Sequence, residues 1–355
     1  MTAADTPGPR HSRRGLFIPL IVVLALLVAW TGWWFVLTQR VEREVLARAE
    51  TLREAGWEIN HGKIEIDGWP FRARLAMRAV EMTAPSGHGA RAPELVAEAN
   101  AYAPLHWVVI APDGLTMLRG DKGRVFVRAE AIRMSVRDVS EAWPQMALEL
   151  IQPTFRAEPG AEAFPISAAE RLTLEARPAT ARPRDAEAPA PGADDLDVLF
   201  QMVEGTGREA GPVDRLTGEG RLSVRTEVTL ERAGALTGMD SAGVFDTWTQ
   251  AGGRFANVRV ELQSGDSRAL LTGGPLVADE DGRLNGSLSV RAERAAPALA
   301  GLATTEDSVV NRAQATAAAG AAAVAERAPV SLVLEFRDGR TWLGPFTLAP
   351  APRLF

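Results

Sequence analysis

The chain contains no cysteine, four histidines, one tyrosine and, among 355 residues, only two lysines, Lys63 and Lys122. Without cysteine, neither a disulfide nor a metal site with thiolate ligands can form. In an oxidising compartment the fold therefore depends on packing alone. The net charge is −6, and the arginines form no stripe interleaved with aromatic residues. These features do not support nucleic-acid binding, and we expect no nucleic-acid partner.

Residues suited to catalysis or metal binding are also scarce. His11, His61, His88 and His106 include no pair with the HExxH spacing of a zinc-binding helix. The chain has no G-x-S-x-G nucleophile motif, and the glycines at 205–211 lack the spacing of a dinucleotide-binding loop. We therefore predict that the protein is not an enzyme and has no catalytic residues, cofactor or metal.

One long apolar run dominates the N-terminal part of the chain. Leu16 to Leu37 is 22 residues long and carries no charge. As a helix it would extend about 33 Å, enough to cross a bilayer core of about 30 Å. Trp30, Trp33 and Trp34 lie near its far end, where indoles favour the interface between membrane and water. A cleaved signal peptide is the alternative, but the run is long for a signal core and no small-residue cleavage site follows it. We predict a transmembrane anchor at 16–37.

The residues that flank the run predict its orientation. Arg10, Arg13 and Arg14 precede it, whereas Arg40 and Arg43 follow it among glutamates. The positive-inside rule then places a disordered tail at 1–15 in the cytoplasm. We expect a single-pass protein of the bacterial inner membrane with its bulk in the periplasm. Apolar residues keep a helical spacing over 38–56, which predicts a helical stalk, with coiled-coil dimerisation as a further option.

Beyond residue 56, apolar residues alternate with charged ones, which is typical of half-buried strands. The pattern predicts strands at 64–66 and 71–78 around a kink at 68–70, and the alternation is cleanest at 221–232 and 330–337. Within 124–137 the alternation changes phase, so we predict a β-bulge at Ala131–Ile132 that keeps one apolar face. Turn signals between the strands imply antiparallel pairing. The predicted fold is mainly β (α+β): a transmembrane helix, then a curved antiparallel sheet with a few covering helices.

The domain organisation follows from composition. A segment at 177–193, rich in proline, alanine and charge, predicts a linker or long loop between two β-rich halves at 57–176 and 194–355. A short helix is predicted at 242–251, ended by Gly252-Gly253. The pattern Thr304-x-x-Asp307 resembles a capping box and predicts an alanine-rich helix at 305–327.

Several stretches together resemble an uncharacterised bacterial family, domain of unknown function 2125. The stretches are Gly68–Arg72 (GWPFR), Ala99–Trp107 (ANAYAPLHW), Gly282–Ala292 followed by Ala296-Pro297, and Asp338–Pro352. The family consists chiefly of inner-membrane-anchored proteins without an assigned activity, so no catalytic residues can be carried over from the resemblance. The motif residues of unknown role are Trp69, Pro70, Phe71, Pro104, His106, Gly344 and Pro345.

The C-terminal pattern, a strand, Asp-Gly, then a strand ending in Leu-Gly-Pro, also resembles AsmA-like proteins of the Gram-negative envelope. That resemblance implies a long curved sheet with an apolar groove and a role in envelope lipid homeostasis. The first hypothesis is therefore that the sheet binds or passes bilayer lipid along an apolar face. The alternative is a non-enzymatic scaffold that docks an envelope protein partner.

Overall fold

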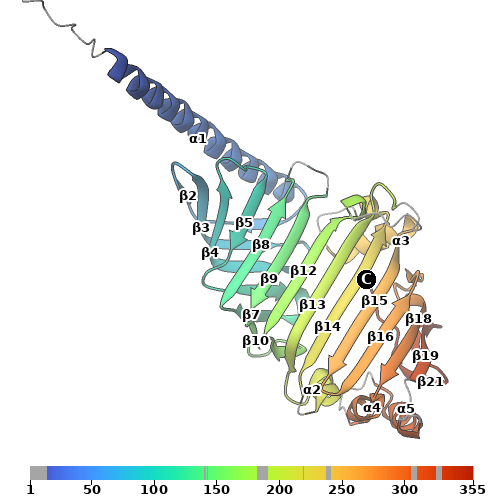
Figure 1. Cartoon of the computed structure of the whole chain (residues 1–355). Coiled ribbons are helices and arrows are strands. Elements are labelled where there is room, and N and C mark those ends of the chain that lie inside the picture. The colour runs from blue at the N-terminus through green and yellow to red at the C-terminus, as the bar shows by residue number, and fades with distance from the viewer. Residues whose placement is uncertain are drawn as a thin grey trace, which may run out of the picture.

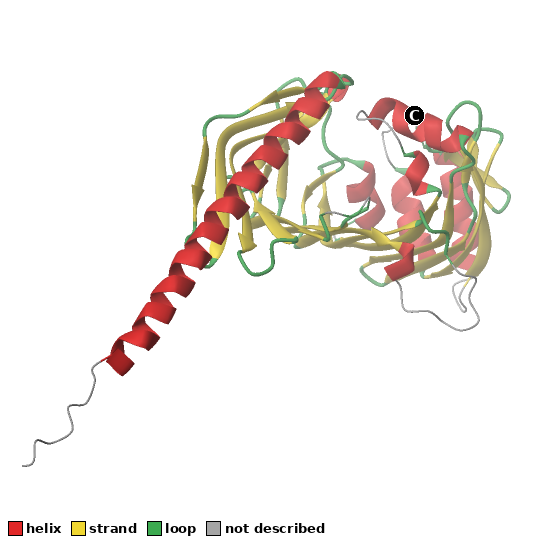
Figure 2. Cartoon of the chain, turned by 90° about the horizontal axis from the view of Figure 1, so that it is seen from above, coloured by secondary structure: helices red, strands yellow, loops and turns green. Residues whose placement is uncertain are grey.

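In the computed structural model, a long helix leads into a curved antiparallel sheet, and shorter helices lie against that sheet (Figures 1 and 2). The structure describes residues 14–139, 141, 143–181, 191–218, 220–236, 241–304, 310–324 and 330–354. Residues 1–13 of the predicted tail, 182–190 of the predicted linker, and Asp307 lie outside the described residues, whereas Arg14 and Gly15 belong to the first helix. The prediction of a mainly β fold with an N-terminal apolar helix and a few covering helices is confirmed.

The first helix, α1 (Arg14–Glu54), runs without a break through the predicted anchor and the predicted stalk. It is long and apolar enough to span a membrane. Gly56 ends it in the left-handed region, with φ of +91°, and the Trp57 N–H donates to the Leu52 carbonyl at 3.0 Å. This is the usual glycine ending of a helix.

Strands make up most of the rest of the chain, and Figure 1 labels most of them. The strands before the predicted linker are β1 (Glu58–Asn60), β2 (Ile64–Asp67), β3 (Arg72–Thr83), β4 (His88–Asn100), β5 (His106–Ile110), β6 (Leu115–Arg119), β7 (Arg124–Arg128), β8 (Ala131–Arg137), β9 (Gln145–Ile151), β10 (Thr154–Ala157), β11 (Ile166–Ala168) and β12 (Arg171–Pro178). Those after it are β13 (Leu196–Gly207), β14 (Leu222–Glu231), β15 (Arg254–Ser264), β16 (Ser267–Gly273), β17 (Val277–Ala278), β18 (Leu284–Glu293), β19 (Val330–Arg337), β20 (Arg340–Leu343) and β21 (Phe346–Pro350).

Strand pairing continues across the segment predicted to divide the chain. β12 pairs with β13 over the whole of 171–178 against 196–203, so both halves belong to one sheet. Neighbours along the sheet are mostly neighbours in sequence, as the turn signals predicted. The kink at 68–70 joins β2 and β3, which pair in register from Ile64 opposite Met77.

A line of strand breaks crosses the first half of the sheet. β5 and β6, β7 and β8, β9 and β10, and β11 and β12 are each separated by a few residues, at 111–114, 129–130, 152–153 and 169–170. The breaks are neighbours: the Glu130 N–H donates to the Ile151 carbonyl at 2.9 Å, and the Gln152 N–H to the Glu170 carbonyl at 2.8 Å. We call this line the crease.

The crease corrects the prediction of a bulge at Ala131–Ile132, which is wrong. β7 pairs with β6 and β10, whereas β8 pairs with β5 and β9. A bulge would have kept both parts in one ladder. Instead, Val125 and Val127 of β7 share a core with Ile132 of β8 and Leu150 of β9. The chain breaks so that apolar residues on both sides of the crease pack together, which explains the change of phase.

Four shorter helices are described: α2 (Pro212–Thr217), α3 (Ser241–Gln250), α4 (Ala295–Ala303) and α5 (Arg312–Val324). The predicted helix at 242–251 is confirmed by α3. The alanine-rich helix predicted at 305–327 is present as α5, which is shorter, while residues 305–309 and 325–327 lie outside the described residues. The Thr304 hydroxyl donates to the Gly301 carbonyl at the end of α4 at 2.8 Å. Asn311 caps α5 instead, accepting from the Gln314 N–H at 3.2 Å.

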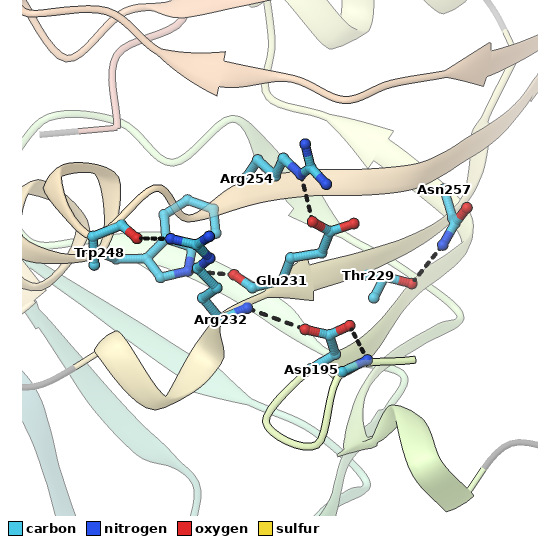
Figure 3. Close-up of polar contacts among 9 residues, drawn as sticks. Asp195, Thr229, Glu231, Arg232, Trp248, Arg254 and Asn257 are labelled. Atoms are coloured by element: carbon cyan, nitrogen blue, oxygen red, sulfur yellow. Dashed lines mark hydrogen bonds and ion pairs between the residues drawn. The ribbon is translucent and has the colours of Figure 1, made fainter. Parts of the chain in front are cut away.

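Helix α3 is fixed to the sheet by a buried tryptophan. Trp248 is fully buried, and its indole N–H donates to the Glu231 carbonyl of β14 at 2.9 Å (Figure 3). The Asp195 carboxylate before β13 accepts from the Arg232 N–H at 3.1 Å (Figure 3). The acidic segment at 194–197 therefore stabilises local structure, because its carboxylates meet backbone and side-chain donors.

Two helical glycines should respond in opposite ways to alanine. A Cβ on Gly301 of α4 would lie 1.8 Å from the Arg215 carbonyl oxygen of α2, whereas a Cβ on Gly320 of α5 meets nothing within 4 Å. We expect Gly301→Ala to lower the free energy of unfolding by about 1–3 kcal/mol through overpacking. Gly320→Ala should raise it by about 0.5–1 kcal/mol, because alanine loses less backbone entropy in a helix. Denaturant unfolding of both variants checks this, and equal effects would contradict the α2–α4 contact.

Candidate functional site

The strand register aligns one residue from each of thirteen strands along one face of the sheet. Directly opposite residues of antiparallel strands share a face, so the alignment can be followed pair by pair. We call this alignment the central row. It consists of Ile66, Leu75, Ala97, Val109, Met134, Leu148, Leu174, Phe200, Thr226, Val260, Leu271, Val290 and Leu332. Thr226 is its one polar member.

Helices cover both ends of the central row. At the N-terminal end, Ile66 packs in a cluster with Trp34 and Leu37 of α1. At the other end, Leu271 and Leu332 pack in a cluster that includes Leu299 of α4. Figure 2 shows α1 beside one end of the curved sheet and shorter helices within its curve.

Helices also border the middle of the row. On one side, Val213 and Leu216 of α2 pack near Met202 and Leu222. On the other, Trp248 of α3 packs near Leu196 and Leu230. Phe200 lies between these two covered zones on β13.

The middle of the central row is exposed. Leu174 of β12 and Phe200 of β13 lie directly opposite each other, and their exposed fractions are 44% and 37%. Leu148 flanks Leu174, and Thr226 flanks Phe200. We call these four residues the apolar strip. None of these four side chains is ionisable, so the strip can take an apolar group.

The opposite face of the sheet is charged. Arg225 pairs with Glu227 at 2.6 Å and Arg259 with Glu261 at 2.5 Å. Across strands, Arg225 lies opposite Glu261 and Glu227 opposite Arg259, so the charges alternate in both directions. These residues border two hollows on this face. The hydrogen bond from Arg254 to Glu231, aided by the carboxylate charge, raises the pKa of Arg254. A face of paired charges is typical of the solvated side of a sheet.

The predicted interfacial tryptophans join α1 to the sheet. The indole N–H of Trp30 donates to the Pro70 carbonyl at 2.7 Å, and that of Trp34 to the Arg72 carbonyl at 2.6 Å. Trp33 donates more weakly to the Ala101 carbonyl, at 3.4 Å.

The family-motif residues fall in two places. Trp69, Pro70 and Phe71 form the β2–β3 loop, and Pro104 and His106 lie in and after the β4–β5 loop. The Trp69 indole donates to the Thr31 hydroxyl of α1 at 3.3 Å, and the Pro104 carbonyl accepts from the Trp107 indole at 2.9 Å. Since the Ala101 carbonyl of the β4–β5 loop accepts from the Trp33 indole, both loops meet α1. The structure separates the other two motif residues from this group: Gly344 and Pro345 form the turn between β20 and β21, with Gly344 at a φ of +54°.

Side chains that could bind a metal are dispersed. Within the described parts of the chain, no three histidine, aspartate or glutamate side chains are grouped as metal ligands. His61, His88 and His106 belong to the β1–β2 loop, the start of β4 and the start of β5. The Asp279 carboxylate, between β17 and β18, accepts from the N–H groups of Asp281 and Arg283 and so stabilises a turn.

Sequence reasoning missed the apolar strip. Leu172 and Leu174 were visible as alternating strand residues, but Leu174 meets Phe200 only through the register of β12 on β13. The segment 195–204 shows no regular apolar–polar alternation, because Leu199 and Phe200 are both apolar although they face opposite sides of the sheet. No local signal shows which apolar residues the helices leave exposed.

Comparison with known proteins gives one match. A family model described as an uncharacterized protein conserved in bacteria, DUF2125, matches residues 34–352, which is most of the chain. Neither a curated protein nor a solved structure matches.

Proposed function

The chain belongs to the DUF2125 family of bacterial proteins, and we propose that it is a single-pass membrane protein that binds lipid acyl chains on the apolar face of its sheet. Its place would be the bacterial inner membrane, with the N-terminus in the cytoplasm and the sheet in the periplasm. The length and composition of α1 support the anchor, and the arginines before it support the orientation.

One observation carries the proposal: the exposed middle of the central row. Leu174 and Phe200 are large apolar residues on neighbouring strands, exposed between zones that α2 and α3 cover. A solvated face would place polar residues at such positions, as the opposite face of β14 and β15 does. Grouped exposed apolar residues bordered by covered ones mark a binding surface for an apolar partner. A linear acyl chain suits a strip that is narrow and crosses several strands.

The proposal assigns the protein no reaction. The apolar strip would hold an acyl chain by burying apolar area, at about 25 cal/mol per Å². The family resemblance gives no catalytic residue, and the AsmA-like resemblance adds a role in envelope lipid homeostasis by analogy alone. The alternative of a scaffold that docks an envelope protein uses the same exposed residues, so the test must separate lipid from protein.

Photo-crosslinking at Phe200 in intact membranes makes that separation. The full-length chain carries p-benzoylphenylalanine at Phe200, and the matched control carries it at Val333, which is similarly exposed, at 44%, on the charged face. We expect phospholipid adducts by mass spectrometry at Phe200 and several-fold fewer at Val333. Adducts to a protein at Phe200 would support the scaffold instead, and equal lipid adducts at both positions would refute a specific lipid site.

A further inference from the structure

The two loops that meet α1 carry the most exposed aromatic side chains outside that helix among the described residues. Trp69 and Phe71 belong to the β2–β3 loop, and Tyr102 and Leu105 to the β4–β5 loop. Their exposed fractions range from 49% to 71%. Tyr102 is the one tyrosine in the chain. The apolar strip contains none of these residues. Four exposed apolar residues grouped on adjacent loops mark an interaction surface.

Hydrogen bonds to α1 fix the height of both loops along the anchor. The Trp69 indole bonds Thr31, and the Pro70 carbonyl bonds the Trp30 indole. On the other loop, the Ala101 carbonyl accepts from Trp33. Both loops therefore lie level with residues 30–34 of the helix.

Residues 30–34 lie within the length of helix that is needed to cross the bilayer core. Leu16 and Trp30 are 14 residues apart, which is about 21 Å of helix, whereas the bilayer core is about 30 Å thick. The helix must therefore continue in the membrane for about six residues beyond Trp30, and a tilted helix needs more. Phe35 and Val36 are large, apolar and more than half exposed, as lipid-facing residues should be. Loops held beside residues 30–34 cannot avoid the outer leaflet.

The charges behind the loops match this placement. Arg72 directly follows Phe71, is largely exposed and lies within 3.5 Å of Glu98. Arg74 pairs with Asp67 at 3.0 Å. Arg74 also lies 3.2 Å from Glu98, so two arginines and two carboxylates form an ion-paired polar layer behind the aromatic tips. At a membrane interface, rings enter the acyl boundary while charged groups stay in the headgroup region.

We propose that the β2–β3 and β4–β5 loops insert Trp69, Phe71, Tyr102 and Leu105 into the outer leaflet of the bilayer that α1 crosses. The inference rests on the anchoring in the proposed function, but not on lipid binding by the strip. The loops form a second membrane contact and, with the indole bonds to α1, hold the first strands against the membrane surface. The family-motif residues Trp69, Pro70 and Phe71 thereby gain a role as a membrane-contact loop.

Nitroxide labels measure this contact directly, because the chain has no cysteine to remove. Single variants Phe71→Cys, Tyr102→Cys, Leu24→Cys and Val333→Cys of the full chain are labelled and placed in phospholipid nanodiscs. Leu24, in α1, reports membrane insertion, and Val333 reports a distant position, because ten strands lie between β3 and β19 in the sheet. All four side chains are exposed, so labelling should not disturb folding, and circular dichroism checks that it does not.

The readout is the collision rate of each label with oxygen, which concentrates in lipid, against that with a water-soluble nickel chelate. We expect the oxygen-to-nickel ratio at Phe71 and Tyr102 to exceed the ratio at Val333 several-fold and to approach that at Leu24. Ratios at both loops equal to that at Val333, with Leu24 in lipid, would overturn the loop contact alone. Loop labels shielded from both reagents would also overturn it, in favour of a protein contact. A water-exposed Leu24 would overturn the anchor itself and this inference with it.

Discussion

Replacing Phe200 by glutamate is expected to reduce lipid capture at the neighbouring Thr226 position by about tenfold or more. Thr226 lies directly opposite Phe200, so p-benzoylphenylalanine at Thr226 reports occupancy of the apolar strip. A carboxylate beside an acyl chain must lose water without gaining a partner. That penalty exceeds the ~1.4 kcal/mol that corresponds to a tenfold change. The measurement is the yield of phospholipid adduct from intact membranes, by mass spectrometry.

Val333→Glu, with the same reporter at Thr226, is the matched control. Val333 is as exposed as Leu174, but it lies on the charged face, so the new carboxylate should leave the adduct yield unchanged. A second variant, Leu174→Glu, should repeat the loss, since Leu174 faces Phe200 across β12 and β13. Equal yields in the Phe200 and Val333 variants would show that the reporter captures bulk lipid, and would refute lipid binding at the apolar strip.

Trp248→Ala is expected to lower the free energy of unfolding by about 3–5 kcal/mol, the usual cost of removing a buried large aromatic residue. Trp248 is fully buried and makes edge contacts with Phe245 and Phe255 at ring separations of 6.0 and 4.9 Å. The variant also loses the indole bond to the Glu231 carbonyl. Denaturant unfolding of the full chain in detergent measures the change.

Phe71→Ala is the control for this loss, because Phe71 is also aromatic but mostly exposed. Its effect on unfolding in detergent should stay within about 0.5 kcal/mol, as for most surface substitutions. A small effect of Trp248→Ala would contradict the packing of α3 on β14. Trp248→Phe should fall between the two, since it keeps most of the apolar volume.

Local patterns were sufficient to predict the long apolar helix, most strands and α3. The run from Leu16 to Leu37 is uncharged and continuously apolar, which predicts a helix long enough to span a membrane. In β14, Leu222, Val224, Val228 and Leu230 alternate with polar residues, as expected for a strand with one apolar face. Gly252 ends α3 with a φ of +79°, a position where glycine is strongly preferred.

Features that depend on distant residues could not be predicted in the same way. The change of phase in the apolar alternation at Ala129–Ile132 is compatible with a bulge as well as with a strand break. The strand breaks because Val125 of β7 and Leu150 of β9 pack in one core across the crease. The predicted start of the alanine-rich helix near residue 305 came from the pattern Thr304-x-x-Asp307, whereas α5 begins at Arg312 and Asn311 is its cap. The exposure of Leu174 and Phe200 depends on where α2 and α3 pack, and those helices lie later in the chain.

The most direct test of the central claim is a crosslinker scan of five consecutive positions on β13, from Val198 to Met202, in the full-length chain in native membranes. Side chains alternate between the two faces of a strand, so the apolar strip predicts phospholipid adducts at Phe200 and few at Leu199 and Gln201. The covered Val198 and Met202 should give intermediate yields. Equal yields at odd and even positions, or a maximum at Leu199 or Gln201, would contradict an acyl-chain site on the apolar face.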